Sequence, residues 1–167
     1  MTTSRRHPNV INIEETQTLE LPGKENLGSS MKMLGAMAGG KAFGCNWYEV
    51  QPGKAAFPLH AHTANEEAIY VLEGKGRLRI GDAEVEVRSG DFVALPPGRA
   101  HAHQLLNDGE APLRYLCWST KVMPEVVHYP DYGKVSYVTP SPSGPPEHRI
   151  FRERDGAERF DELEASE

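Results

Sequence analysis

Four of the seven histidines in this 167-residue chain occur as two His-x-His pairs, His60/His62 and His101/His103. Alternate side chains of a β-strand point to the same face, so each pair would present two imidazoles in one direction. A carboxylate, Glu67, follows the first pair. Neutral imidazole and carboxylate are suitable ligands for first-row divalent metals. The spacing therefore predicts a metal site, with a polar cluster that binds no metal as the alternative.

The residues around the pairs follow two motifs, with glycines on both sides of the first pair and a glycine, a Pro-x-Gly turn and an asparagine around the second. These flanking residues are Gly53, Gly74, Gly90, Pro96, Gly98 and Asn107. The arrangement resembles the cupin superfamily over roughly residues 42–120. The segments EEAIYVLEGKGRLRIGD and GDFVALPPG also look like small single-domain bacterial cupins, including those described as sugar-phosphate-isomerase-like.

The second motif departs from the family pattern. Counting two residues on from Gly98 selects His101, whereas counting three residues back from Asn107 selects His103. We favour His103, because extra residues fit more easily into the Pro-Pro-Gly loop than into the strand that follows. On a regular strand His101 would share its face and line the pocket. The first motif also has six residues between Gly53 and His60 where the family usually has five, which a loop can absorb.

A similar choice arises between two neighbouring carboxylates, Glu66 and Glu67. Glu67 has the family spacing, and it alternates with Ile69 and Val71, which would continue the inward face of a strand. Glu66 falls on the opposite face. The predicted ligand set, listed in chain order, is His60, His62, Glu67 and His103.

These ligands suit a divalent transition metal, and iron, manganese, zinc and nickel all tolerate them. The resemblance implies chemistry from dioxygenation to sugar-phosphate isomerisation, decarboxylation and simple ligand binding, among which a fold cannot choose. Two functions stay open: a metal-dependent isomerase or dioxygenase acting on a small organic molecule, and a non-catalytic module that binds or senses one. Catalysis needs an acid or base besides the ligands, and His101 is the candidate.

Composition excludes several other classes. The chain has 18 Lys and Arg against 24 Asp and Glu, a net charge of −6, which does not favour nucleic acid or an anionic membrane surface as a partner. The sequence has no apolar run of about 20 residues for a membrane span, and no apolar stretch follows its basic start. Two cysteines are too few for a disulfide scaffold. We expect a cytoplasmic protein with a small-molecule ligand.

The elements that must position the ligands are short strands. Runs rich in Val, Ile, Tyr, Phe and Trp recur between Gly, Pro and Asp, with no long helical pattern, which favours an all-β antiparallel barrel. The expected strands lie near 42–50, 56–62, 67–73, 76–80, 83–88, 92–95, 101–106 and 112–120. Gly81-Asp82 marks a two-residue hairpin turn. With the family resemblance, this predicts a jelly roll, or double-stranded β-helix, over 42–120.

The rest of the chain is expected to surround the barrel. Residues 1–41 would form an N-terminal extension with peripheral strands, and 121–167 an irregular C-terminal extension with an acidic tail. The tail is expected to be a solvated arm or a short packed helix. Tyr70 and Leu72 would point away from the barrel interior, so their face needs a cover. The N-terminal segment or a second copy of the chain could supply it, and we expect a homodimer.

Overall fold

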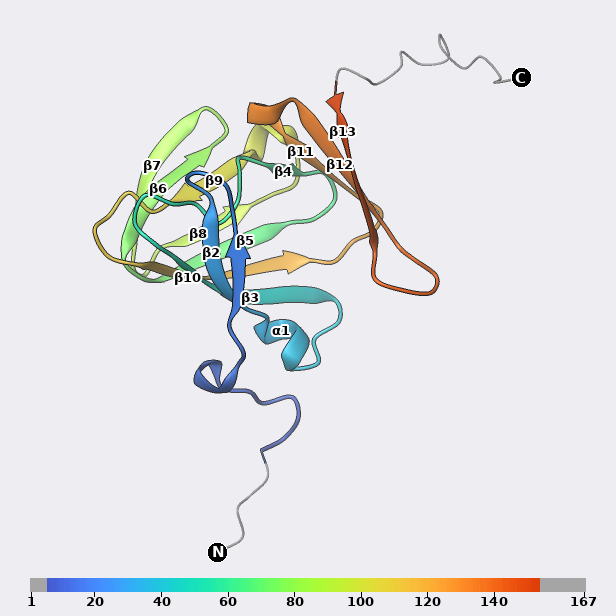
Figure 1. The fold of residues 1–167 in the computed structure, drawn as a ribbon, viewed down its shortest axis with the longest axis horizontal. Coiled ribbons are helices and arrows are strands. Elements are labelled where there is room, and N and C mark those ends of the chain that lie inside the picture. The colour runs from blue at the N-terminus through green and yellow to red at the C-terminus, as the bar shows by residue number, and fades with distance from the viewer. Residues whose placement is uncertain (1–5, 154–167) are drawn as a thin grey trace, which may run out of the picture.

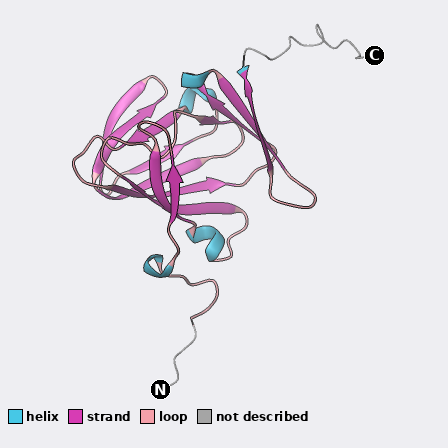
Figure 2. Ribbon diagram, in the orientation of Figure 1, coloured by secondary structure: helices cyan, strands magenta, loops and turns pink. Residues whose placement is uncertain are grey.

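Antiparallel strands are the main secondary structure of the computed structural model, which describes residues 6–153 (Figures 1 and 2). The largest sheet has the order β1 (Leu19–Pro22), β2 (Gly28–Lys32), β3 (Phe43–Val50), β10 (Leu113–Thr120), β5 (Glu67–Glu73), β8 (Phe92–Leu95). A second has the order β7 (Ala83–Arg88), β6 (Lys75–Ile80), β9 (His103–Leu106). The third has the order β13 (Glu147–Arg152), β12 (Lys134–Thr139), β11 (Glu125–Tyr129), β4 (Ala61–His62). The predicted all-β jelly-roll barrel is confirmed.

The helices of the described region are all short. They are the 3₁₀ turns η1 (Ile13–Glu15), η2 (Arg99–His101) and η3 (Pro130–Tyr132), and the helix α1 (Leu34–Met37). None of the helices within residues 6–153 has the length and apolar character needed to cross a membrane.

Alternation along the strands fills the barrel core. In β5, Ile69 and Val71 are buried, whereas Tyr70 and Leu72 point outward and are each 38% exposed. Val71 packs in one cluster with fully buried residues of other strands, such as Leu113 of β10. Full burial of an aliphatic side chain of this kind stabilises the fold by about 1.5–3 kcal/mol. The inward and outward faces expected for β5 are therefore the observed ones.

The hairpin between β6 and β7 turns at Gly81-Asp82, as predicted, with Ile80 paired to Ala83. Gly81 has a φ of +54°, and a Cβ at this position would lie 2.6 Å from the carbonyl oxygen of Ala100. Glycine is therefore required both by the backbone conformation and by the close approach of η2. Val85 alternates with the buried Val87, which predicts a buried side chain, but Val85 is 45% exposed on the edge strand β7.

Two of the expected strands are shorter than predicted. The strand expected over 56–62 is reduced to β4, with only isolated pairing at Ala55 and His60, because Pro58 cannot donate a ladder hydrogen bond. The strand expected over 101–106 begins at His103, because η2 follows Gly98 and takes up residues 99–101.

The N-terminal extension forms the hairpin β1–β2, which continues the large sheet beyond β3. Peripheral strands were expected. The Val- and Ile-rich run at residues 10–13 also has the composition of a strand, but it forms none, and η1 begins at Ile13. Since the hairpin lies at the sheet edge, it leaves the outer face of β5 partly exposed. It is not the cover that this face was expected to need.

The C-terminal segment is not irregular, in contrast to the prediction for 121–167. Residues 125–152 contain β11, β12 and β13, and β11 pairs with β4, so that Val127 lies opposite His62 (Figure 1). Only the Pro-rich stretch 140–146 is a loop, since proline interrupts pairing there. The last part of the acidic tail, 154–167, lies outside the described residues.

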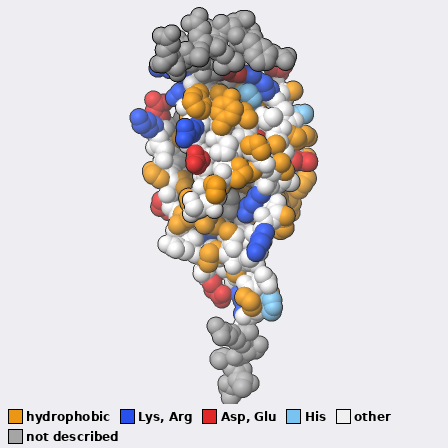
Figure 3. Space-filling view, turned by 90° about the vertical axis from the view of Figure 1, so that its right-hand side faces the viewer, with side chains coloured by type: hydrophobic (Ala, Val, Ile, Leu, Met, Phe, Trp, Pro, Cys, Tyr) orange, Lys and Arg blue, Asp and Glu red, His pale blue; other side chains and the backbone are white. Residues whose placement is uncertain are grey.

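The outward face of this third sheet is partly apolar. Tyr137 of β12 and Phe151 of β13 are exposed, and their rings contact each other with centroids 5.7 Å apart. Figure 3 faces this side of the molecule and shows hydrophobic side chains gathered on it among scattered charges.

Candidate metal centre

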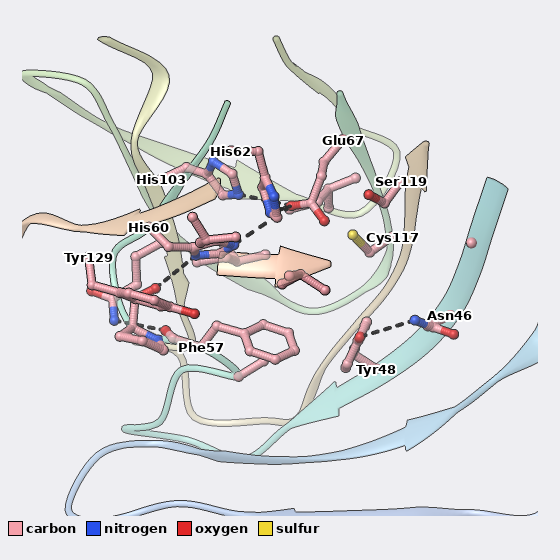
Figure 4. A pocket seen from close by; sticks show the side chains of 18 of the residues that line it. Asn46, Tyr48, Phe57, His60, His62, Glu67, His103, Cys117, Ser119 and Tyr129 are labelled. Carbon is pink, nitrogen blue, oxygen red and sulfur yellow. Dashed lines mark hydrogen bonds and ion pairs between the residues drawn. The ribbon is translucent and has the colours of Figure 1, made fainter. Parts of the chain in front are cut away.

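The four predicted ligands come from β4 and the residue before it, from β5 and from β9, one strand of each of the three sheets, and they meet inside the barrel (Figure 4). His60 directly precedes β4 and His62 ends it, while Glu67 is the first residue of β5 and His103 the first of β9. Glu67 is at the centre of the group. Its Oε2 atom lies 3.1 Å from Nε2 of His103, 3.5 Å from Nε2 of His62 and 3.8 Å from Nε2 of His60.

The backbone fixes the positions of two of these histidines. The N–H of His60 donates to the carbonyl of His103 at 3.1 Å, and the N–H of His103 donates back to the carbonyl of His60 at 2.8 Å. Their ring centroids are consequently only 4.5 Å apart. The possible ligand atoms of His60, His62 and Glu67 all lie within 4.8 Å of one another, and His103 joins this trio through Glu67.

The tautomers of His60 and His103 follow from their neighbours. Nδ1 of His60 lies 2.9 Å from the carbonyl oxygen of Pro58, and Nδ1 of His103 lies 3.0 Å from that of His101. Because a carbonyl oxygen can only accept, each Nδ1 must carry a hydrogen and donate it. In the neutral ring this leaves the lone pair on Nε2, which is the atom that faces Glu67. Metal-binding histidines use the same arrangement to fix the ring and its tautomer.

The Nδ1 atom of His62 has a different environment. This nitrogen is buried and has no hydrogen-bond partner among residues 6–153, but Oε2 of Glu125 lies 3.7 Å away. Glu125 is only 3% exposed, and its carboxylate accepts hydrogen bonds from the backbone N–H groups of Thr63, Ala64 and Asn65. Glu125 thus holds the loop between two predicted ligands and places a negative charge behind one of them.

The ionisation of the site reflects burial and mutual contact. Burial, followed by the proximity of His103, lowers the pKa of His60 to about 4, so this ring is neutral near pH 7. Burial alone would raise the pKa of Glu67, but its contacts with His103 and His62 hold that pKa well below the usual range. For His62, burial acts to lower the pKa, and the carboxylates of Glu67 and Glu125 outweigh it and raise the pKa.

A divalent cation fits this group of side chains. Three Nε2 atoms converge on one carboxylate oxygen, and the low pKa of His60 leaves a lone pair on its Nε2 atom. A cation at their common point would attract all four donors, and imidazole with carboxylate is the donor set of iron, manganese, nickel and zinc sites. In a polar cluster without a metal, the raised pKa of His62 suits an ion pair with Glu67, whereas the lowered pKa of His60 keeps that ring neutral and able to bind a cation.

His101 lies apart from the other predicted site residues. It ends η2, its Nδ1 atom is 3.3 Å from the carbonyl oxygen of Pro97, and it does not line the cavity that the described residues form. The expectation that His101 and His103 share a face assumed a regular strand, which η2 replaces. The predicted catalytic role of His101 therefore has no support from its position. Glu66 is exposed, in contrast to Glu67.

The four side chains line one wall of a cavity of about 520 Å³. A further part of the lining comes from β11, η3, β12 and β13, which supply Tyr129, Lys134, His148 and Ile150 among others. The sequence analysis missed these residues because it treated the segment as irregular. The alternating run Lys-Val-Ser-Tyr-Val at 134–138 is the signal that could have located them. Cys117 also lines the cavity, and burial raises the pKa of its thiol well above the usual value, which keeps it protonated.

Comparison with known proteins matches the barrel to one family model. The model described as "Cupin domain" matches residues 46–119. An uncharacterized protein of Methanocaldococcus jannaschii is 39% identical over 61 residues, 36% of this chain and 47% of that protein. Quercetin 2,3-dioxygenase of Bacillus subtilis is 38% identical over 50 residues, 30% of this chain and 15% of the enzyme. The chain thus spans about half the length of the first relative and a small part of the second.

Similar solved structures cover much more of the chain. A predicted sugar phosphate isomerase from Acidithiobacillus ferrooxidans superposes with a TM-score of 0.79 at 25% identity, over 91% of this chain and 97% of that one. A sugar phosphate isomerase from Silicibacter pomeroyi superposes with a TM-score of 0.76 at 23% identity, over 91% and 98%. At such identities the agreement lies in the fold, which includes the segments outside the barrel.

Proposed function

The barrel of this chain belongs to the cupin superfamily, and we propose that it holds a divalent transition metal and binds a small organic molecule beside the ion. The metal ligands in this proposal are His60, His62, Glu67 and His103. The observation that carries it is the convergence of three imidazole Nε2 atoms on one buried carboxylate, at the wall of a cavity large enough for a small molecule.

The proposed activity is metal-dependent conversion of the bound molecule, by isomerisation or by dioxygenation. A bound metal would supply Lewis-acid chemistry, which polarises a carbonyl group or acidifies a hydroxyl group. The side chains of the cavity orient the molecule and exclude water. His148, which lines the cavity, is placed better than His101, which does not, to move a proton. The sugar phosphate isomerases support the first reaction and the Bacillus subtilis dioxygenase the second.

A second candidate is a module that binds or senses a small molecule without converting it. The position of His101 outside the cavity favours this alternative, because it removes the acid or base expected from the sequence. Tyr48, which lines the cavity, does not replace it, since burial raises the pKa of its hydroxyl well above the usual value. Incubation of the protein with a molecule that it binds, followed by analysis for reaction products, separates the two candidates.

Metal content of purified variants tests the proposal directly. The comparison uses His62→Ala and, as a matched control, His7→Ala. His7 is exposed and does not line the cavity. After loading with Mn(II) and removal of excess ion, we expect close to one equivalent in the wild type and in His7→Ala. The His62→Ala variant should retain only a small fraction of it. Full occupancy in His62→Ala would contradict the ligand assignment.

A further inference from the structure

Positive charge gathers where the cavity borders η3 and the strands that follow it. Lys134, the first residue of β12, lines the cavity, and it also lines a second pocket together with Tyr132, Gly133, Arg152 and Glu153. Because Tyr132 and Lys134 belong to both linings, the two pockets are adjacent. This arrangement places Arg152 beside the cavity, although it does not line the cavity itself.

The pairing of β12 with β13 directs these two cations to the same side. Lys134 is the direct partner of Arg152, and such partners on antiparallel strands share a face, with their Cβ atoms about 5 Å apart. Arg152 alternates along β13 with Ile150 and His148, which both line the cavity, so the shared face is the one toward the cavity. Like charges placed directly opposite each other destabilise a sheet, and an anion bound between them would remove this cost.

The carboxylate in the second pocket already has other partners. Oε1 of Glu153 lies 2.6 Å from Nη1 of Arg99 and 3.6 Å from Nδ1 of His128. Neither Lys134 nor Arg152 forms an ion pair with any residue in 6–153. Within the described part of the chain, the two cations are therefore available to an anion from outside.

The cation pair lies in line with one of the predicted metal ligands. Tyr129 of β11 pairs with Lys134, and its ring lies nearly parallel to that of His60 with centroids 6.4 Å apart (Figure 4). The row across the sheet is therefore His60, Tyr129, Lys134 and Arg152. Since neighbouring strands lie about 4.8 Å apart, the backbone of Lys134 is about 10 Å from that of His60, and the backbone of Arg152 about 14 Å. A small molecule that lies along Tyr129 can reach both ends of this row.

From these observations we propose that Lys134 and Arg152 form a subsite for one anionic group, a carboxylate or a phosphate, of the molecule that the cavity binds. Ammonium and guanidinium groups are charge-assisted donors, which proteins use to bind both kinds of anion. That this group is the far end of a metal-bound molecule rests on the proposed function. The subsite itself needs no metal.

An NMR titration of the ¹⁵N-labelled protein with sodium phosphate, in EDTA and at constant ionic strength, tests the subsite. We expect saturable shifts of the amide signals of Gly133, Lys134 and Arg152. Lys134→Gln and Arg152→Gln should each weaken phosphate binding about tenfold, because each removes one charged donor. Both side chains are exposed, so neither variant should disturb the fold. Arg149→Gln is the matched control, because Arg149 is paired with the outward-facing Tyr137 on the other face of β13.

The same titration with sodium acetate distinguishes the two kinds of anion. Saturable shifts with both salts would support a subsite for either group, and shifts with one salt alone would assign the subsite to that group. The absence of saturable shifts with both would overturn the proposal. Wild-type affinity in Lys134→Gln and Arg152→Gln would also overturn it, as would an equal loss in Arg149→Gln, which would indicate general screening of surface charge.

The two proposals can fail separately, because the anion titration is made without metal. If the chain binds phosphate or acetate at these residues but takes up no Mn(II), the subsite stands and the proposed function fails. If the chain takes up Mn(II) but shows no saturable anion binding, the metal site stands and the subsite is refuted.

Discussion

Glu125 joins the C-terminal sheet to the loop that carries the predicted metal ligands, and replacing it should destabilise the whole protein. Its carboxylate is 3% exposed. It accepts from the backbone N–H of Thr63 at 2.9 Å, of Ala64 at 3.1 Å and of Asn65 at 2.9 Å. These contacts hold its pKa below the usual range although burial acts in the opposite direction, so the group is charged near pH 7.

The size of the effect follows from the three donors. Glu125→Ala leaves them without their acceptor, and an unsatisfied buried donor costs about 1–3 kcal/mol. Because the loop can relax and admit water, we expect a loss of about 3–5 kcal/mol in the free energy of unfolding, near the low end of the sum. Glu125→Gln keeps one acceptor oxygen but turns an amide N–H toward Asn65, and should cost about 1–2 kcal/mol.

Urea unfolding of the protein in EDTA, followed by circular dichroism, measures these values without a contribution from metal. Glu86→Ala is the control, because Glu86 is an exposed carboxylate on the edge strand β7. In a separate Mn(II) titration, Glu125→Gln should lower the affinity about tenfold or more, since the carboxylate lies behind His62. A Glu125→Ala variant within about 0.5 kcal/mol of the control would refute the reasoning.

Two further predictions concern pH and assembly. Since the pKa of His60 is lowered to about 4 from 6.5, the unfolded chain binds a proton at this ring at a higher pH than the folded chain does. The free energy of unfolding of the metal-free protein should therefore fall by up to about 3 kcal/mol as the pH falls from 6.5 to 4. Urea unfolding at several pH values should show this loss in the wild type and not in His60→Asn. The outer face of β5 and β8 is apolar and open, with Tyr70 and Leu72 38% exposed and Phe92 65% exposed. We expect a homodimer to bury this face. Light scattering should then give about twice 18.5 kDa, and a mass near 18.5 kDa would refute the dimer.

The barrel was predictable because its signals are local. Alternation in β5 and the Gly81-Asp82 turn each depend on a few adjacent residues, and the structure reproduces both. The grouping of the four predicted ligands was also accessible, because their spacing matches a family pattern. The position of His101 was not, since it depends on whether the chain after Gly98 continues as a strand or forms a 3₁₀ turn.

The C-terminal sheet was missed for a different physical reason. Its strands are separated by Tyr129-Pro130 and by a Pro-rich loop, both of which favour irregular structure when considered alone. The formation of strand β11 depends on its pairing with β4, a strand of only two residues about 60 positions earlier. It also depends on the buried contact of Glu125 with loop 63–65. Pairing over such a distance leaves no local trace of β11 in the sequence, in contrast to the alternation at 134–138 that marks β12.

Two parts of the cavity lining have separate origins along the chain, which bears on how such a protein can diversify. The predicted ligands all lie within residues 46–119, whereas further lining residues come from 127–150. Mutations in β12 and β13 can therefore reshape the space available to a ligand and leave the ligand-bearing strands unaltered. Glu125 sets the boundary, because β11 is anchored to the loop after His62. A chimera in which β12 and β13 are replaced, from η3 onward, by those of a related barrel should acquire the ligand selectivity of that barrel. It should keep the predicted metal ligands of this chain.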